Sequence, residues 1–145
     1  MEIRGGIMQE AVISYVAVLV AAIANMVLGS LWFGPLFGKI WMKWSDITSA
    51  KLEQMKKQGM GKTYTVGFIA SLIMSYVLAH FVDYVEATTL VAAVQLAFWV
   101  WLGFIATVQI GGVLWEGKPV KLFALTTTYQ LVSLVVMAII LTLLV

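Results

Sequence analysis

A single carboxamide lies inside a long apolar run, within the stretch ANMVLGSLWFGPLFGKIWMKW at positions 24–44. Burying an amide without a hydrogen-bonding partner is costly, so Asn25 predicts a polar group facing it from another part of the chain. Gln130 and the neighbouring Tyr129 are the candidate partners, because counting ~1.5 Å per residue puts them at a similar depth in another apolar run. Such a contact can hold two helices together or line a polar pocket, and both interpretations stay open.

The pocket interpretation requires further residues at the depth of Asn25. Ser71 and Ser75 bracket that level in the second apolar run, and Gly103 leaves a gap there in the third, with Trp99 as an aromatic wall. The candidate binding residues, reached from the cytoplasmic side, are therefore Asn25, Ser71, Ser75, Trp99, Gly103, Tyr129 and Gln130.

The lone histidine is a second candidate, at the outer end of the second apolar run. His80 is followed by Asp83 three residues later, which could form an ionisable site on the outer face. A structural role is the simpler interpretation, because a histidine at the membrane surface can reach water. One histidine with one aspartate is a poor metal site, since structural zinc takes four ligands. We predict no catalytic residue, no metal site and no cofactor, and an enzyme is the least favoured class.

Four apolar runs must position these residues. Hydrophobic residues make up 62% of the 145 positions and charged residues only 11%, which a soluble domain of this size could not accommodate. Each run has roughly the 20 residues that a membrane-spanning helix needs. The sequence therefore predicts an all-α integral membrane four-helix bundle, a single transmembrane domain over residues 1–145, with spans of about 11–33, 63–82, 88–115 and 122–145.

Small and polar residues recur at helical spacing in every run, and membrane helices pack through such stripes. We expect these stripes to face the bundle interior and Trp101 to point toward lipid or a second subunit. The stripes are Ala17, Ala21, Asn25 and Gly29; Gly67, Ser71, Ser75 and Ala79; Gln95, Trp99, Gly103, Thr107 and Gly111; and Thr126, Gln130 and Ser133 or Leu134.

The lysines predict the orientation. Eight of the nine basic residues fall in the loops after the first and third runs. The positive-inside rule puts such loops on the cytoplasmic side of the plasma membrane. Both chain ends would then lie outside. The first run is too long for a signal peptide and is expected to be retained. Met8 is a plausible second start, which would make residues 1–7 a dispensable extension.

The loop after the first run contains tryptophan, glycine, proline and lysine. Gly34, Pro35 and Gly38 should end the first helix and turn the chain. Residues 39–60 then have the spacing of one or two short helices, which we expect to lie on the inner membrane surface as an interfacial segment. A solvated loop is the alternative. The expected contacts with the bilayer and its anionic headgroups are Trp32, Lys39, Trp41, Lys43 and Trp44.

Three stretches carry a family resemblance. VAAIANMVLGSLWFGPLFGKIWMK resembles the start of a family of small four-helix prokaryotic membrane proteins catalogued as domain of unknown function 1761. WLGFIATV and YQLVSLVVMAIIL are similar to its third and fourth helices. The resemblance implies a fold and a topology for most of the chain from about Met8, and no activity.

Two functional classes stay open beside the disfavoured enzyme. The first is a small oligomeric transporter or channel-like subunit with a polar site in the inner half of the bundle, although no span holds the carboxylate of a proton-coupled exporter. The alternative is a non-transporting lipid-binding or scaffolding protein at the inner surface. The lipid bilayer is the expected partner, a homo-oligomer is possible, and no nucleic acid is expected because the basic loop faces a membrane.

Overall fold

The computed structural model describes residues 11–144, and the chain is helical through most of them. The first half contains α1 (Tyr15–Leu31), the π-helical turn η1 (Trp32–Leu36), α2 (Gly38–Trp44), α3 (Ser49–Lys57) and α4 (Gly61–Tyr84). The second half contains α5 (Leu90–Trp101), the π-helical turn η2 (Leu102–Ala106), α6 (Thr107–Glu116) and α7 (Val120–Leu143). The possible second start at Met8 lies outside the described residues.

Four segments of the described chain are long and apolar enough to cross a membrane. They are Tyr15–Leu36, Gly61–Tyr84, Leu90–Glu116 and Val120–Leu143, with mean hydropathies between 1.8 and 2.2. Each falls on one of the four predicted spans, so the all-helical, four-span prediction is confirmed.

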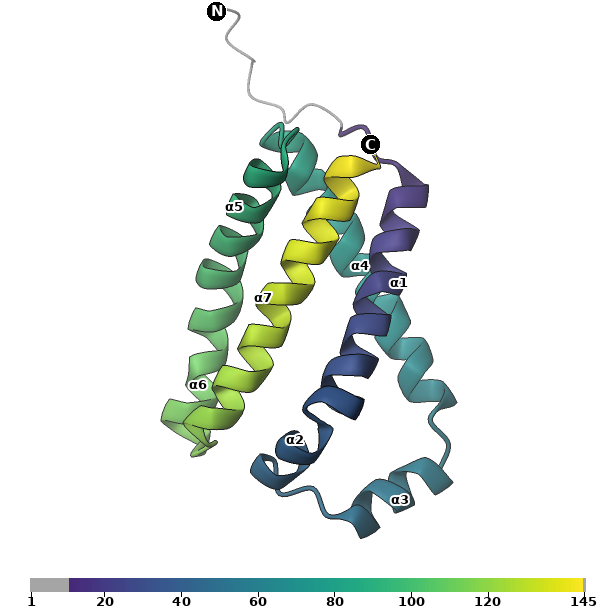
Figure 1. Ribbon diagram of the computed structural model, residues 1–145, viewed down its shortest axis with the longest axis vertical. Helices are drawn as coiled ribbons and strands as arrows, with labels where there is room; N and C mark the ends of the chain where they lie inside the picture. Colours follow the sequence, from purple (N-terminus) through teal and green to yellow (C-terminus); the bar gives the residue numbers. More distant parts are fainter. Residues whose placement is uncertain (1–10, 145) are drawn as a thin grey trace, which may run out of the picture.

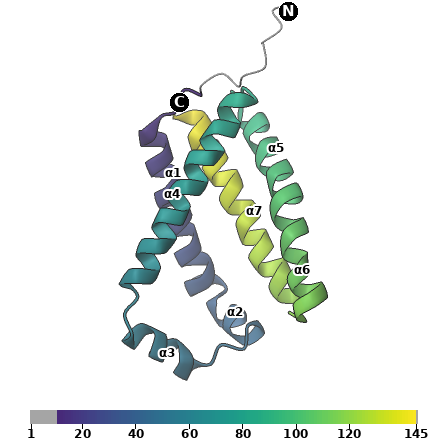
Figure 2. The same cartoon turned by 180° about the vertical axis from the view of Figure 1, so that it is seen from behind.

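Helix α7 is the centre of the arrangement. It packs against α1 on one side and α5 on the other, and α4 covers α1 (Figures 1 and 2). The start of α1 and the end of α7 meet at one end of the bundle, while α2, α3 and α6 lie at the other (Figure 1). We call the latter the lysine-rich end, because it holds Lys39, Lys43, Lys51, Lys56, Lys57, Lys62, Lys118 and Lys121.

Small side chains form most of the core. Ala17 and Ala21 of α1, Ala93 and Ala97 of α5, and Ala138 of α7 have no exposed surface. Such side chains let helix backbones approach closely, which is how helices associate when lipid removes the usual hydrophobic drive. The predicted interior stripes of α1 and α4 are confirmed along most of their length, because Asn25 of α1 and Ser71, Ser75 and Ala79 of α4 are also buried.

The interior face predicted for the third span is wrong. Trp99 is 64% exposed, and Gln95, Gly103 and Thr107 also face outward. Trp101, expected to point away, packs on the core instead and donates from its indole Nε1 to the Thr127 carbonyl oxygen over 2.7 Å.

The reason for this reversal is that the polar groups of the predicted face need no partner in the bundle. Thr107 donates to the carbonyl oxygen of Gly103 in its own helix over 2.7 Å. Gln95 lies five residues from the start of α5, or roughly 8 Å along the axis, where headgroups and water are near. The face of α5 that packs against α7 is therefore the one with the alanines, because small side chains allow the closest approach of the two helices.

The glycine–proline segment after α1 turns the chain as predicted. Gly34 leaves helical geometry, with φ −109° and ψ −105°, next to Pro35 in η1. Gly38 is buried, and a Cβ there would lie 2.7 Å from the Phe33 carbonyl oxygen, so a side chain would force α2 away from η1. Glycine at this position allows α2 to fold back beside the bundle.

Residues 39–60 form two short helices, as the spacing predicts. Most of α2 and all of α3 fall in this range, and Thr48 caps α3 by accepting from the Lys51 amide over 3.2 Å. Helix α3 stands apart from the four long helices, whereas α2 folds back toward the lysine-rich end of α7 (Figure 1). The position of this segment on a membrane surface stays a prediction.

Candidate functional site

Asn25 is the centre of a buried hydrogen-bond network that joins three helices. Its Nδ2 donates to Ser71 Oγ of α4 over 2.7 Å, and its Oδ1 accepts from Tyr129 Oη of α7 over 3.1 Å. Ser133 Oγ of α7 donates to the same Oδ1. The side chain thus faces the interior, as its stripe predicts, and its amide group is paired within the protein.

A second contact joins α4 to α1 one turn away. Ser75 Oγ donates to the Val18 carbonyl oxygen over 2.8 Å, and Ser75 has no exposed surface. Ser71 and Ser75 therefore act as interhelical contacts, and neither lines the cavities described below.

Tyr129 connects this network to the lysine-rich end. Its ring lies 5.0 Å from the Phe33 ring and 6.0 Å from the Trp32 ring, centre to centre. On its other side, a Cβ at Gly29 would lie only 2.8 Å from Tyr129 Oη. The absence of a side chain at Gly29 therefore lets the hydroxyl reach Asn25.

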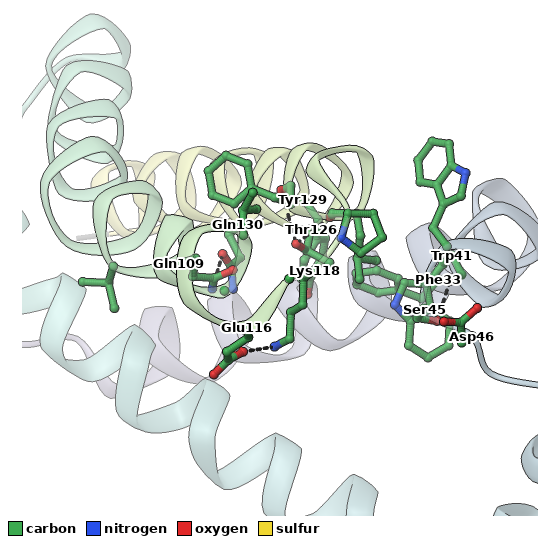
Figure 3. A pocket seen from close by; sticks show the side chains of 18 residues that line it. Phe33, Trp41, Ser45, Asp46, Gln109, Glu116, Lys118, Thr126, Tyr129 and Gln130 are labelled. Carbon is green, nitrogen blue, oxygen red and sulfur yellow. Dashed lines mark hydrogen bonds and ion pairs between the residues drawn. The ribbon is translucent and has the colours of Figure 1, made fainter.

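A cavity of about 920 Å³ lies between α2 and the neighbouring ends of α6 and α7, at the lysine-rich end. Phe33, Trp41 and Ser45 line one side of it, and Gln109, Gln130 and Glu116 line the facing side (Figure 3). The remaining lining residues are Trp44, Asp46, Val108, Gly112, Val113, Gly117, Lys118, Pro119, Leu122, Phe123, Thr126 and Tyr129.

The two glutamines of this cavity bond to each other. Gln109 Nε2 of α6 donates to Gln130 Oε1 of α7 over 2.8 Å (Figure 3). Of the two candidate partners of Asn25, Tyr129 makes the contact and Gln130 does not.

Gln109 is the most informative of the cavity residues that the sequence reasoning missed, because it bonds to the predicted Gln130. A signal was available, because Gln109 and Gln130 lie ten and eleven residues on either side of Pro119 in a helical hairpin, which brings them to one level.

Charged groups surround the opening of the cavity. Lys118 Nζ lies 3.0 Å from Glu116 Oε2, and both side chains are largely exposed. Lys121 Nζ lies 6.0 Å from the centre of the Trp44 ring, the outer limit of a cation–π contact. Asp46, with φ 57°, lies two residues after the end of α2, on the opposite side (Figure 3).

The predicted binding residues thus divide into three groups. Tyr129 and Gln130 line the cavity; Asn25, Ser71 and Ser75 form the buried contacts; Trp99 and Gly103 face outward, away from both. Of the predicted membrane-surface residues, Trp41 and Trp44 line the cavity, and Lys39 and Lys43 are exposed on α2. The Trp32 ring contacts the Phe37 ring, with ring centres 4.7 Å apart and planes tilted by 50°.

The opposite end of the bundle holds His80 and a smaller cavity. His80 Nδ1 lies 2.8 Å from the Tyr76 carbonyl oxygen, and because a carbonyl only accepts, this nitrogen carries the proton. A cavity of about 400 Å³ is lined by Asp83, Glu86 and Thr142, among others, but not by His80. Within residues 11–144, no group of three or more histidine, aspartate or glutamate side chains could hold a metal ion.

These features define the class of protein first: a four-span helical membrane protein with a cavity at one end of its bundle. Residues 16–142 match the family described as Protein of unknown function (DUF1761), and the chain belongs to this family. No curated protein and no solved structure matches the chain.

Proposed function

We propose that this protein is a membrane-embedded binding protein whose ligand occupies the cavity between α2 and the α6–α7 hairpin. The observation that carries the proposal is the cavity itself, with about 920 Å³ of space, an aromatic wall and a floor of uncharged polar groups. Ligand sites are typically concave spaces of this size in which a few polar groups converge on an otherwise apolar lining.

The packing of the other half of the bundle supports a site with access from one end. Five alanines of the core have no exposed surface: Ala17, Ala21, Ala93, Ala97 and Ala138. Between this core and the cavity, the Asn25 side chain bonds to Ser71 and Tyr129 and so holds three helices together. A ligand in the cavity would reach Tyr129 and meet a sealed core beyond it.

Two neighbouring glycines give a matched test. Gly112 lines the cavity, and a Cβ there would meet the Lys118 side chain at 3.2 Å; at Gly111 the nearest atom is Trp115 Cδ1, at 3.7 Å, and Gly111 does not line the cavity. We expect native mass spectrometry of protein released from its membranes to detect a bound small molecule on the wild type and on Gly111→Leu, but not on Gly112→Leu. The same adduct on all three, or on none, would contradict the proposal.

Transport is the second candidate, since a cavity closed at one end is what one state of an alternating-access carrier requires. The chain has no cysteine, so single cysteines report access without background. In a carrier, Ala138→Cys, at a position now fully buried, becomes reactive to an impermeant maleimide from the side opposite the lysines during turnover. In a binding protein it stays protected.

The same labelling experiment tests the proposed orientation in the plasma membrane, with both ends outside and α3 in the cytoplasm. The support is the group of eight lysines at one end of the bundle. Lys51→Cys, on the exposed surface of α3, should react in inside-out vesicles and not in intact cells. In this orientation the exposed Lys39 and Lys43 face anionic headgroups of the inner leaflet, the bilayer contact of the proposed surface segment.

A further inference from the structure

The hydrogen-bonding capacity of the cavity floor is only partly used. The contact between Gln109 and Gln130 takes one N–H of Gln109 and one lone pair of Gln130 Oε1. A carboxamide has two donors and an oxygen that accepts twice, so one N–H of Gln109, both N–H groups of Gln130 and Gln109 Oε1 make no further hydrogen bond within the described residues.

Two hydroxyls beside the glutamines add acceptors. Thr126 Oγ1 donates to the Leu122 carbonyl oxygen over 2.9 Å, and Tyr129 Oη donates to Asn25 Oδ1. Each hydroxyl hydrogen is thereby used inside the bundle, while the oxygen retains lone pairs. The floor therefore offers both donors and acceptors to whatever lies on it.

Few charged residues line the cavity, and none of them forms its floor. Glu116 pairs with Lys118, and Asp46 lies on the other side, where Lys121 Nζ is 6.0 Å from the centre of the Trp44 ring. A charged head would have to leave water for a floor of neutral amides and hydroxyls, which costs several kcal/mol without a charged partner.

Apart from Ser45, the remaining lining residues are apolar or glycine, and this part of the lining reaches the outside of the bundle. Phe33 and Trp41 form an aromatic pair with ring centres 5.5 Å apart. Val108 also lines the cavity, although it is 70% exposed on the outer surface of α6 within the third span. The edge of the cavity thus meets the surface that lipid chains cover.

We infer that the ligand is an uncharged amphiphile whose head carries both hydrogen-bond donors and acceptors, such as a carboxamide, and whose chain leaves past Val108 into the bilayer. The head lies on the Gln109–Gln130 pair beside Thr126, and the wall of Phe33 and Trp41 covers the first part of the chain. This inference rests on the binding function proposed above and names its ligand class.

Three probes with the same unsaturated chain test the head group: oleamide is uncharged, oleate is anionic and oleylamine is cationic at neutral pH. Equilibrium binding is measured on the full chain in maltoside micelles. We expect oleamide to bind at least tenfold more tightly than either charged probe. Gln130→Leu and Gln109→Leu should each reduce that preference by about tenfold, the value of roughly one hydrogen bond.

Gln95→Leu is the matched control, because it removes a carboxamide from the exposed face of α5, outside the cavity. It should leave the preference for oleamide unchanged. The inferred class is wrong if oleate or oleylamine binds most tightly, if all three probes bind equally, or if the control variant loses as much as the cavity variants. None of these results changes the outcome of the native mass spectrometry on Gly111→Leu and Gly112→Leu, which tests the binding function separately.

Discussion

Gly29→Ala is expected to destabilise the bundle, and Tyr129→Phe is expected to relieve that effect. The new Cβ would lie 2.8 Å from Tyr129 Oη, and the ring cannot easily move because the rings of Trp32 and Phe33 flank it. Overpacking of this kind costs about 1–3 kcal/mol. The displaced hydroxyl would also lose its hydrogen bond to Asn25.

A double-mutant cycle isolates the contact. Without the hydroxyl, the nearest atom to the new Cβ is Tyr129 Cζ at 3.5 Å, an ordinary van der Waals distance, so Gly29→Ala should be close to neutral in the Tyr129→Phe background. We expect a coupling energy of about 2 kcal/mol, within the range for residues in contact. Unfolding by sodium dodecyl sulfate in mixed micelles measures it. Additive effects would mean that Tyr129 does not approach Gly29.

Asn25→Ala is the second large effect. It removes the side-chain bonds to Ser71, Tyr129 and Ser133 and leaves a cavity among three helices. At an average of about 0.6 kcal/mol for an interhelical bond in a membrane, three bonds predict a loss of roughly 2 kcal/mol, before the cavity is counted.

Ser30→Ala on the same helix is the control for Asn25→Ala. Ser30 Oγ is exposed and donates only to the Met26 carbonyl oxygen within α1, over 2.9 Å. Its replacement should change the free energy of unfolding by less than about 0.5 kcal/mol. Equal effects of the two substitutions in the same micelle titration would mean that the hydrogen bonds of Asn25 stabilise the bundle no more than the exposed bond of Ser30 does.

The sequence predicted the parts of the fold that follow from single helices. The spans followed from the length of the apolar runs, because lipid requires about 20 apolar residues per helix. The inward position of Asn25 followed from the cost of an unpaired amide, since a residue in mid-span has no water within reach. Gly34 and Pro35 predicted the turn after α1 for an equally local reason, because glycine readily leaves helical geometry and proline lacks the amide hydrogen that continues a helix.

The errors arose where the answer depended on which helices are neighbours. The stripe through Gln95 and Trp99 has the same spacing as the one through Ala93 and Ala97, so periodicity could not choose between two faces of α5. The choice was set by contact with α7, where alanines let the backbones approach. Gln130 likewise bonds to Gln109 rather than Asn25, because α6 and α7 form a hairpin with both amides at one level. The cavity itself depends on α2 folding back toward α7, which no local pattern specifies.

An experimental structure of the protein in nanodiscs that retain its native lipids tests the central claim most directly. We expect a ligand in the cavity, with its head against Gln109 and Gln130 and its apolar part between Trp41 and Val108. A cavity holding no ligand, or closed by α2 packing directly onto the α6–α7 hairpin, would contradict the claim that this space is the functional site.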